Sequence, residues 1–204
     1  MRSEKFTRAW FGVTAAVALT GLVTQVALTA SDPGGQVANL FCFFTIDSNL
    51  LVTLVSTLVA LGLVRGRLFA VLWLDALAGI IVTGIVYQVA LAGLHDLHGL
   101  AFFADTMLHK VTPILFVLGW LLAGPRGALS WRTVWWSLLY PLTWLAFTLP
   151  RGALTGFYPY PFVDAGALGY GLVTLNCLFI GLFFTALTAG AFLYDRRFAR
   201  LEPA

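Results

Sequence analysis

The chain has 204 residues, of which 60% are hydrophobic and only 10% are charged, and its formal net charge is +3. A globular domain is nearer half apolar and a quarter charged, so this composition predicts an all-α, polytopic membrane protein instead of a soluble domain. The basic residues are scattered between apolar stretches and form no basic face with interleaved aromatic residues, which argues against nucleic-acid binding.

Six segments are apolar over roughly the 20 residues that a helix needs to cross the hydrocarbon core. In chain order, the predicted membrane helices cover residues 9–30, 40–64, 69–93, 103–123, 131–150 and 167–193. Turn-forming or charged residues separate them, such as SDPGGQ after the first helix and GPRG after the fourth. Residues 1–204 are therefore predicted to form a single six-helix transmembrane domain.

The distribution of Lys and Arg predicts how the chain is oriented, because cytoplasmic loops carry an excess of positive charge. On one side of the predicted helices lie ten basic residues, namely Arg2, Lys5, Arg8, Arg65, Arg67, Arg126, Arg132, Arg196, Arg197 and Arg200. On the other side, Arg151 is alone. Both termini are therefore expected in the cytoplasm, which agrees with an even number of spans.

Polar side chains collect in the outer third of the predicted bundle. Thr45 and His109 lie about 7.5 and 9 Å from the outer ends of the second and fourth predicted helices, at 1.5 Å per residue. Ionisable groups at membrane depth are costly and usually face a bundle interior or a wet cavity. We therefore expect an outward-facing polar pocket, with Arg151, Asn176 and the segment 157–164 around it.

Helical spacing predicts which of these side chains act together. Asp105 and His109 are four residues apart, so the carboxylate could orient the imidazole ring. Thr45 and Asn49 have the same spacing, and Asn49 could position Thr45 or donate to a developing oxyanion. Pro113 removes the backbone hydrogen bond to residue 109, which predicts a distorted helix or a break beside His109.

These residues leave three kinds of function open. A threonine nucleophile needs an adjacent base, and His109 is the only histidine within a predicted helix. His95 and His98, followed by Asp105 and His109, could instead bind zinc, although a solvated loop pair is the simpler interpretation. A non-enzymatic protein could use the same pocket to bind or transport a lipid or a small amphiphile. We expect neither a metal nor a cofactor.

The order of several short motifs adds a resemblance. These motifs are Phe44-Thr45-x-x-Ser48-Asn49, His109 with Pro113, Gly124-Pro125-Arg126-Gly127, Arg151-Gly152, and Tyr158-Pro159-Tyr160-Pro161-Phe162. The chain resembles actinobacterial six-helix integral membrane proteins of unassigned function. More distantly, it is similar to the androgen-induced-gene family, which includes the androgen-dependent TFPI-regulating protein. Those proteins are transmembrane threonine hydrolases that cleave fatty acid esters of hydroxy fatty acids.

The resemblance implies a function and an assignment of roles. Thr45 would be the nucleophile and His109 the essential histidine, and the substrate would be a membrane lipid or fatty-acid ester. The chain would lie in a bacterial plasma membrane. The supporting residues expected around the pair are Asp105, Asn49, Asn176, Arg151 and Tyr160.

Overall fold

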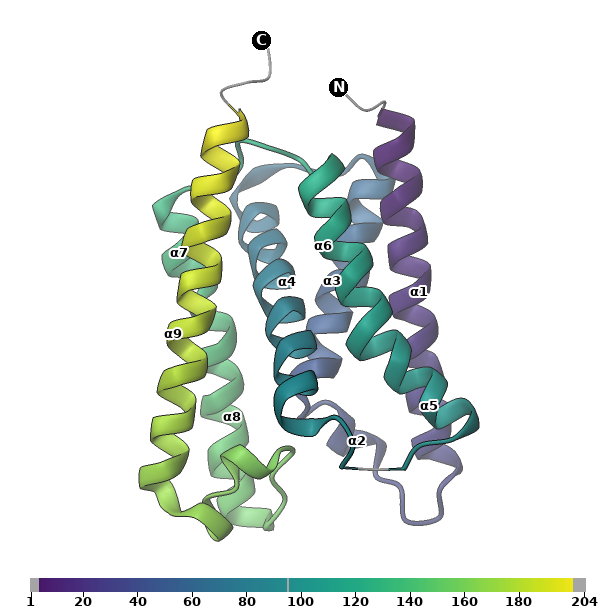
Figure 1. Ribbon diagram of the computed structural model, residues 1–204, viewed down its shortest axis with the longest axis vertical. Coiled ribbons are helices and arrows are strands. Elements are labelled where there is room, and N and C mark those ends of the chain that lie inside the picture. The colour runs from purple at the N-terminus through teal and green to yellow at the C-terminus, as the bar shows by residue number, and fades with distance from the viewer. Residues whose placement is uncertain (1–3, 95, 200–204) are drawn as a thin grey trace.

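The computed structural model describes residues 4–94 and 96–199, which are almost entirely helical and contain no strand (Figure 1). This confirms the predicted all-α class. Of the residues used above, Arg2, His95 and Arg200 lie outside the described ranges. The α-helices are α1 (Glu4–Ser31), α2 (Val37–Leu40), α3 (Phe44–Leu61), α4 (Gly66–Val86), α5 (Gly99–Thr106), α6 (Thr112–Ala123), α7 (Trp131–Ser137), α8 (Leu139–Thr155) and α9 (Ala165–Ala199).

Three short turns of other helical types complete the fold. Two are π-helical: η1 (Tyr87–Leu91) continues α4, and η2 (Met107–Val111) joins α5 to α6. The third is the 3₁₀ turn η3 (Pro161–Val163), which precedes α9.

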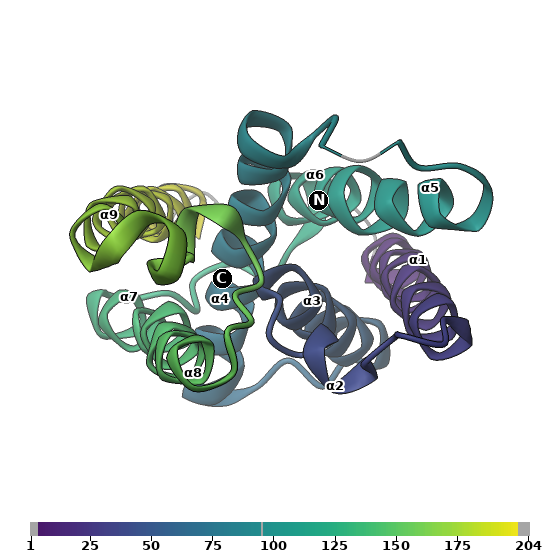
Figure 2. The same ribbon diagram turned by 90° about the horizontal axis from the view of Figure 1, so that it is seen from below.

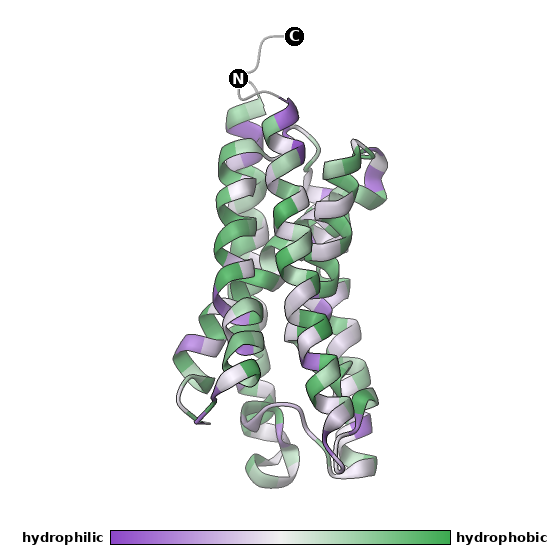
Figure 3. Cartoon of the chain, turned by 90° about the vertical axis from the view of Figure 1, so that its right-hand side faces the viewer, coloured by the Kyte–Doolittle hydropathy of each residue, from purple (hydrophilic) through white to green (hydrophobic). Residues whose placement is uncertain are grey.

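Five helical stretches are long and apolar enough to cross a membrane. They are Glu4–Ser31, Phe44–Leu61, Gly66–Leu91, Gly99–Ala123 and Ala165–Ala199. The region predicted as the fifth span is different, because it is divided at Leu138 into α7 and the 17-residue α8. Large apolar side chains such as Leu154 and Val89 are more than 80% exposed, as expected for surfaces that contact lipid. Figure 3 shows that apolar residues predominate along the helices.

Several predicted boundaries differ from the structure by a few residues, as at Glu4 and Ala199, and two of the differences affect the site. The second helix does not begin at residue 40, because residues 37–40 form the separate helix α2 and the chain bends before α3 begins at Phe44. The fifth helical region does not end at residue 150, because α8 continues through Pro150 to Thr155. Thr45 is therefore the second residue of its helix, and Arg151 is helical.

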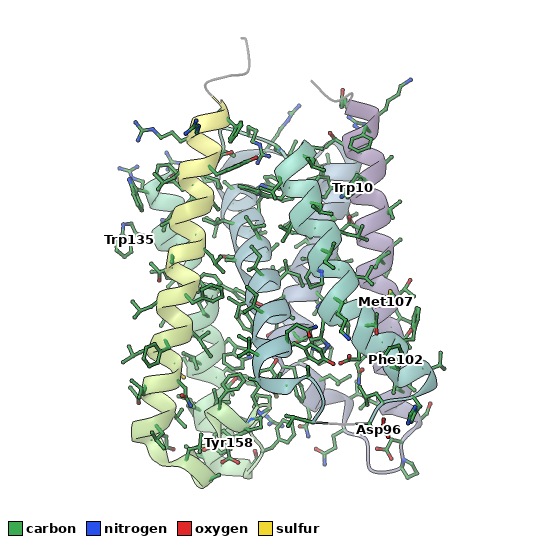
Figure 4. The ribbon with its side chains drawn as sticks, in the orientation of Figure 1. Trp10, Asp96, Phe102, Met107, Trp135 and Tyr158 are labelled. Atoms are coloured by element: carbon green, nitrogen blue, oxygen red, sulfur yellow. The ribbon has the colours of Figure 1, made fainter. Side chains whose placement is uncertain are left out.

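The helices form two groups with α4 between them. Figures 1 and 2 show α7, α8 and α9 on one side of α4, and α1, α3, α5 and α6 on the other. The start of α1 and the end of α9 lie at the same end of the bundle (Figure 1). At that end Trp10 lies between α1 and α6 (Figure 4), and its indole N–H donates to the carbonyl of Leu115 at 3.0 Å.

Candidate functional site

Two π-helical turns shape the site. Pro113 has no N–H to return to the carbonyl of residue 109, and η2 occupies residues 107–111 immediately before it, so the distortion expected beside His109 is present. Facing it, η1 begins at Tyr87. The Tyr87 and His109 rings stack with their centroids 4.0 Å apart and an interplanar angle of 15°.

Thr45 and His109 lie together at the centre of the site. Thr45 comes from the first turn of α3, and its Oγ1 is 3.3 Å from Nε2 of His109. Both side chains are largely shielded, with Thr45 7% exposed as a residue and the His109 side chain 16% exposed. A hydroxyl at this distance from an imidazole nitrogen has the arrangement of a nucleophile and its base.

Asp105 holds the imidazole in the orientation that this chemistry requires. Its Oδ1 lies 3.0 Å from Nδ1 of His109, and its backbone carbonyl lies 3.1 Å from the same nitrogen. Two acceptors around Nδ1 favour the tautomer with the proton on that nitrogen, which leaves Nε2 free to accept from Thr45. The Tyr87 hydroxyl donates to Asp105 Oδ2 at 2.5 Å, so the carboxylate is held at both oxygens.

Tyr160 completes the surroundings of the Thr45 hydroxyl. The backbone N–H of Thr45 donates to the Tyr160 hydroxyl oxygen at 3.1 Å, and that oxygen is 3.2 Å from Thr45 Oγ1. When the Thr45 hydroxyl donates to His109 Nε2, the contact between the two hydroxyls takes its proton from Tyr160. Burial raises the pKa of Tyr160 to about 12, so the phenol remains a neutral donor at physiological pH.

Asn49 positions the pair but does not face the Thr45 hydroxyl. Its side-chain amide donates to the carbonyls of Thr45, at 2.8 Å, and Leu108, at 3.2 Å. Both N–H donors are thereby used in joining α3 to η2. Of the two roles expected for Asn49, the structure shows positioning, whereas an oxyanion donor at this residue is not supported.

Asn176 and Arg151 support the segment 157–164 and lie apart from Thr45 and His109. The Asn176 amide donates to the carbonyl of Phe162 at 2.9 Å. Arg151 hydrogen-bonds to Asn39, and its guanidinium lies 5.1 Å from the centre of the Phe157 ring. These contacts hold the loop that carries Tyr160 against the end of the bundle that contains Thr45.

Two cavities meet at Thr45. The lateral cavity, of about 490 Å³, lies between α3, α4, α8 and α9, and its surface is mostly apolar although several Thr and Tyr side chains line it. The outer cavity, of about 520 Å³, lies between α1, α5, η2 and the segment 159–161, and its lining is more polar. The residues that line both cavities are Thr45, Tyr87, Leu91 and Tyr160. Thr45 therefore lies in the wall of both cavities.

The structure gives no support to a zinc site. Within residues 4–94 and 96–199, no three His, Cys, Asp or Glu residues are grouped so that they could hold a metal ion. His98 lies 3.3 Å from Asp96, with both side chains more than 80% exposed. Figure 4 shows Asp96 at the end of the bundle opposite Trp10. His95, the other histidine of the proposed ligand set, lies outside the described residues.

No protein-family model, curated protein or solved structure matches the chain. Function must therefore be inferred from the geometry of the site.

The sequence interpretation omitted Tyr87 from the site. Tyr87 both stacks on His109 and donates to Asp105, so it fixes the base and the group that orients the base. One signal was present, because Tyr87 lies near the outer end of its predicted helix, at the level where the other polar residues collect. Nothing in the local sequence indicated the π turn that begins at Tyr87.

Proposed function

We propose that the chain is an intramembrane lipid-ester hydrolase in which Thr45 is the nucleophile and His109 the general base. The observation that carries this proposal is the series of contacts from Thr45 Oγ1 to His109 Nε2, at 3.3 Å, and from His109 Nδ1 to Asp105, at 3.0 Å. Nucleophile, base and orienting carboxylate are the three roles of a hydrolase triad, which is recognised by geometry and not by sequence position.

The proposed reaction follows from these contacts. Thr45 Oγ1 attacks the ester carbonyl carbon while its proton passes to His109 Nε2, and the tetrahedral intermediate collapses as His109 protonates the departing alcohol. Water then attacks the acyl-threonine ester and gives a proton to His109, which passes it to Thr45 Oγ1 as the bond to the acyl carbon breaks and the carboxylic acid is released. Asp105 stabilises the imidazolium that forms in each half of the cycle.

Tyr160 is the proposed donor to the oxyanion. Its hydroxyl is 3.2 Å from Thr45 Oγ1, so an acyl carbonyl attached to Thr45 would lie within its reach. The backbone N–H of Thr45, near the positive end of the α3 dipole, already donates to the phenol oxygen and strengthens its proton as a donor. Neutral donors aimed at the position where charge develops are the usual means of stabilising such an intermediate.

We propose six membrane crossings, with α7 and α8 together forming the fifth along the chain. Five stretches are individually long enough, and the α7–α8 pair extends from residue 131 to 155. The ends of α1 and α9 at one end of the bundle support placing both termini on the basic, cytoplasmic side (Figure 1). In a bacterial plasma membrane, the Thr45 site would then lie in the outer half of the bilayer.

The apolar lateral cavity supports a fatty-acyl ester as substrate, and the family resemblance suggests an ester of a hydroxy fatty acid. The cavity also fits the alternative function, because an apolar space of about 490 Å³ could bind a lipid without any reaction. The two functions differ in whether the Thr45 hydroxyl is chemically activated.

Labelling by a fluorophosphonate probe tests that difference. An activated Thr45 Oγ1 displaces fluoride from phosphorus and leaves a stable phosphonate ester, so the purified wild-type protein should be labelled and Thr45→Ala should not. Thr53→Ala is the matched control, since Thr53 lies two turns further along α3 and donates to the carbonyl of Asn49. Absence of label on the wild type, or equal labelling of Thr45→Ala, would reject the hydrolase in favour of the binding protein.

A further inference from the structure

The two cavities at Thr45 differ in chemistry, and an ester has two different halves. The lateral cavity is apolar, whereas the lining of the outer cavity includes the polar side chains Gln25, Thr29, Asp32 and Asp105. An ester carbonyl placed at Thr45 must direct its acyl chain into one cavity and its alcohol into the other. The lining of each cavity therefore indicates which half of the ester that cavity suits.

The lateral cavity suits the acyl chain. Its lining residues on α9 run from Tyr170 to Thr185, a rise of about 22 Å at 1.5 Å per residue. Gly181 belongs to this lining, and a Cβ added there would meet no atom within 4 Å. Exposed apolar residues such as Leu178 and Leu182 stand at its edge, so a chain can enter from the surrounding lipid.

The outer cavity suits a polar alcohol that carries no negative charge. Asp105 lies in its wall, and Asp32 lies immediately after α1 with its Oδ1 accepting from the N–H of Gly34 at 3.2 Å. The lining residues in the described part of the chain include no Lys or Arg. Gln25 and Thr29 lie one turn apart on α1 and line the same space with neutral polar groups. The Gln25 amide donates to the Thr29 hydroxyl at 3.5 Å, which leaves the Gln25 side-chain oxygen as an acceptor for the alcohol.

We infer that the substrate is the ester of a fatty acid with an uncharged, hydroxyl-bearing alcohol of the glycerol type. The acyl chain occupies the lateral cavity and the alcohol occupies the outer cavity, where its hydroxyls reach Gln25, Thr29 and Asp32. A carboxylate on the alcohol would meet the carboxylates of Asp32 and Asp105, and His109, the basic side chain in the described lining, is already bound to Asp105. Such juxtaposition of like charges is unfavourable. This inference rests on the proposed function. It narrows the leaving alcohol to one without a carboxylate, which a hydroxy fatty acid carries.

The first experiment compares two palmitoyl esters in mixed detergent micelles, one of glycerol and one of hydroxystearic acid. We expect kcat/KM to be about tenfold higher for the glycerol ester, which corresponds to a difference of about 1.4 kcal/mol in transition-state stabilisation. Asp32→Lys should reduce that ratio to about one or below, because it replaces the repelling charge by an attracting one. Asp96→Lys makes the same change of charge at an exposed loop residue that lines neither cavity, and it should leave the ratio as in the wild type.

The second experiment tests the acyl half with Gly181→Leu. The added side chain projects into the lateral cavity, so hydrolysis of palmitoylglycerol should fall about tenfold or more while that of acetylglycerol is retained. Gly190→Leu is the matched control on α9, since a Cβ there also meets nothing within 4 Å and Gly190 does not line the cavity. It should leave both rates unchanged.

The outcomes separate this inference from the proposed function. Hydrolysis that depends on Thr45 but prefers the hydroxystearate ester, or a ratio unaffected by Asp32→Lys, would overturn the inference and leave the hydrolase intact. Equal effects of Gly181→Leu on long and short acyl chains would also overturn it. Hydrolysis that persists in Thr45→Ala would overturn the proposed function itself.

Discussion

The two halves of the bundle use polar residues in different ways. In the half that contains Thr45, here called the outer half, five polar side chains bond to one another and line cavities. They are Thr45, His109, Asp105, Tyr87 and Tyr160. In the inner half, which contains Phe11, Trp73 and Phe116, aromatic side chains fill the space.

Packing in the inner half is dense. Phe11, Trp73 and Phe116 are at most 1% exposed and meet edge to face, with ring centroids 5.2 to 6.0 Å apart. Nearby, Asp75 Oδ1 and Ser56 Oγ are buried and find no hydrogen-bond partner among the described residues. Burial of a polar side chain within the bundle is therefore not enough to form a functional site. The Thr45 cluster differs in that packing leaves cavities beside it and hydrogen bonds fix the orientation of its side chains.

The largest expected effect comes from removing the base. His109→Gln should reduce kcat for hydrolysis of a palmitoyl ester by about 10⁴-fold, because no group then accepts the Thr45 proton. The thermal unfolding midpoint should stay close to that of the wild type. Lys110→Gln is the adjacent control: its ammonium lies 5.9 Å from the Tyr87 and Phe102 rings, and kcat should change little. Comparable losses in both variants would contradict the assignment of the base.

A smaller effect is expected at Tyr160. Tyr160→Phe keeps the ring, which stacks on Phe162 with centroids 5.1 Å apart, but removes the hydroxyl proton. We expect kcat to fall about 10²-fold with little change in KM, as on losing one oxyanion donor. Tyr158→Phe makes the same change in the same loop and should stay near wild type. A rise in KM with kcat unchanged would make Tyr160 a binding residue only.

Substitutions in the inner half should lower the stability of the protein and leave its hydrolytic activity unchanged. Phe116→Ala leaves a cavity among Phe11 and Trp73 and should lower the free energy of unfolding by about 2 kcal/mol, mainly through lost packing. Ile114→Ala, on the same helix at a residue 59% exposed, should cost much less. Thermal unfolding in detergent measures both. If Phe116→Ala lowered kcat more than stability, the division between the halves would fail.

The smallest effect is expected at Asp75. This residue is 5% exposed and its Oδ1 lacks a partner in the described structure, so Asp75→Asn preserves shape while removing a titratable group. Stability should change by less than about 1 kcal/mol, because no hydrogen bond to that oxygen is lost. Hydrolysis should be unchanged. A loss of activity here would show that the inner half contributes to the chemistry.

The sequence alone determined the features that depend on local spacing. Its apolar runs required helices, because backbone polar groups in lipid must be satisfied within the segment. The spacing of four residues between Asp105 and His109 placed both on one face, and Pro113 predicted the distortion beside them. These features follow from helical geometry and do not depend on which helices are neighbours.

Only the tertiary structure decided what meets Thr45. Its contact with His109 joins residues 64 positions apart, and its contact with Tyr160 joins residues 115 apart. The position of Tyr87 over the imidazole, the use of both Asn49 donors by backbone carbonyls, and the two cavities also depend on how the helices pack. Helical periodicity tells which face a side chain occupies. Packing between helices determines what that face touches.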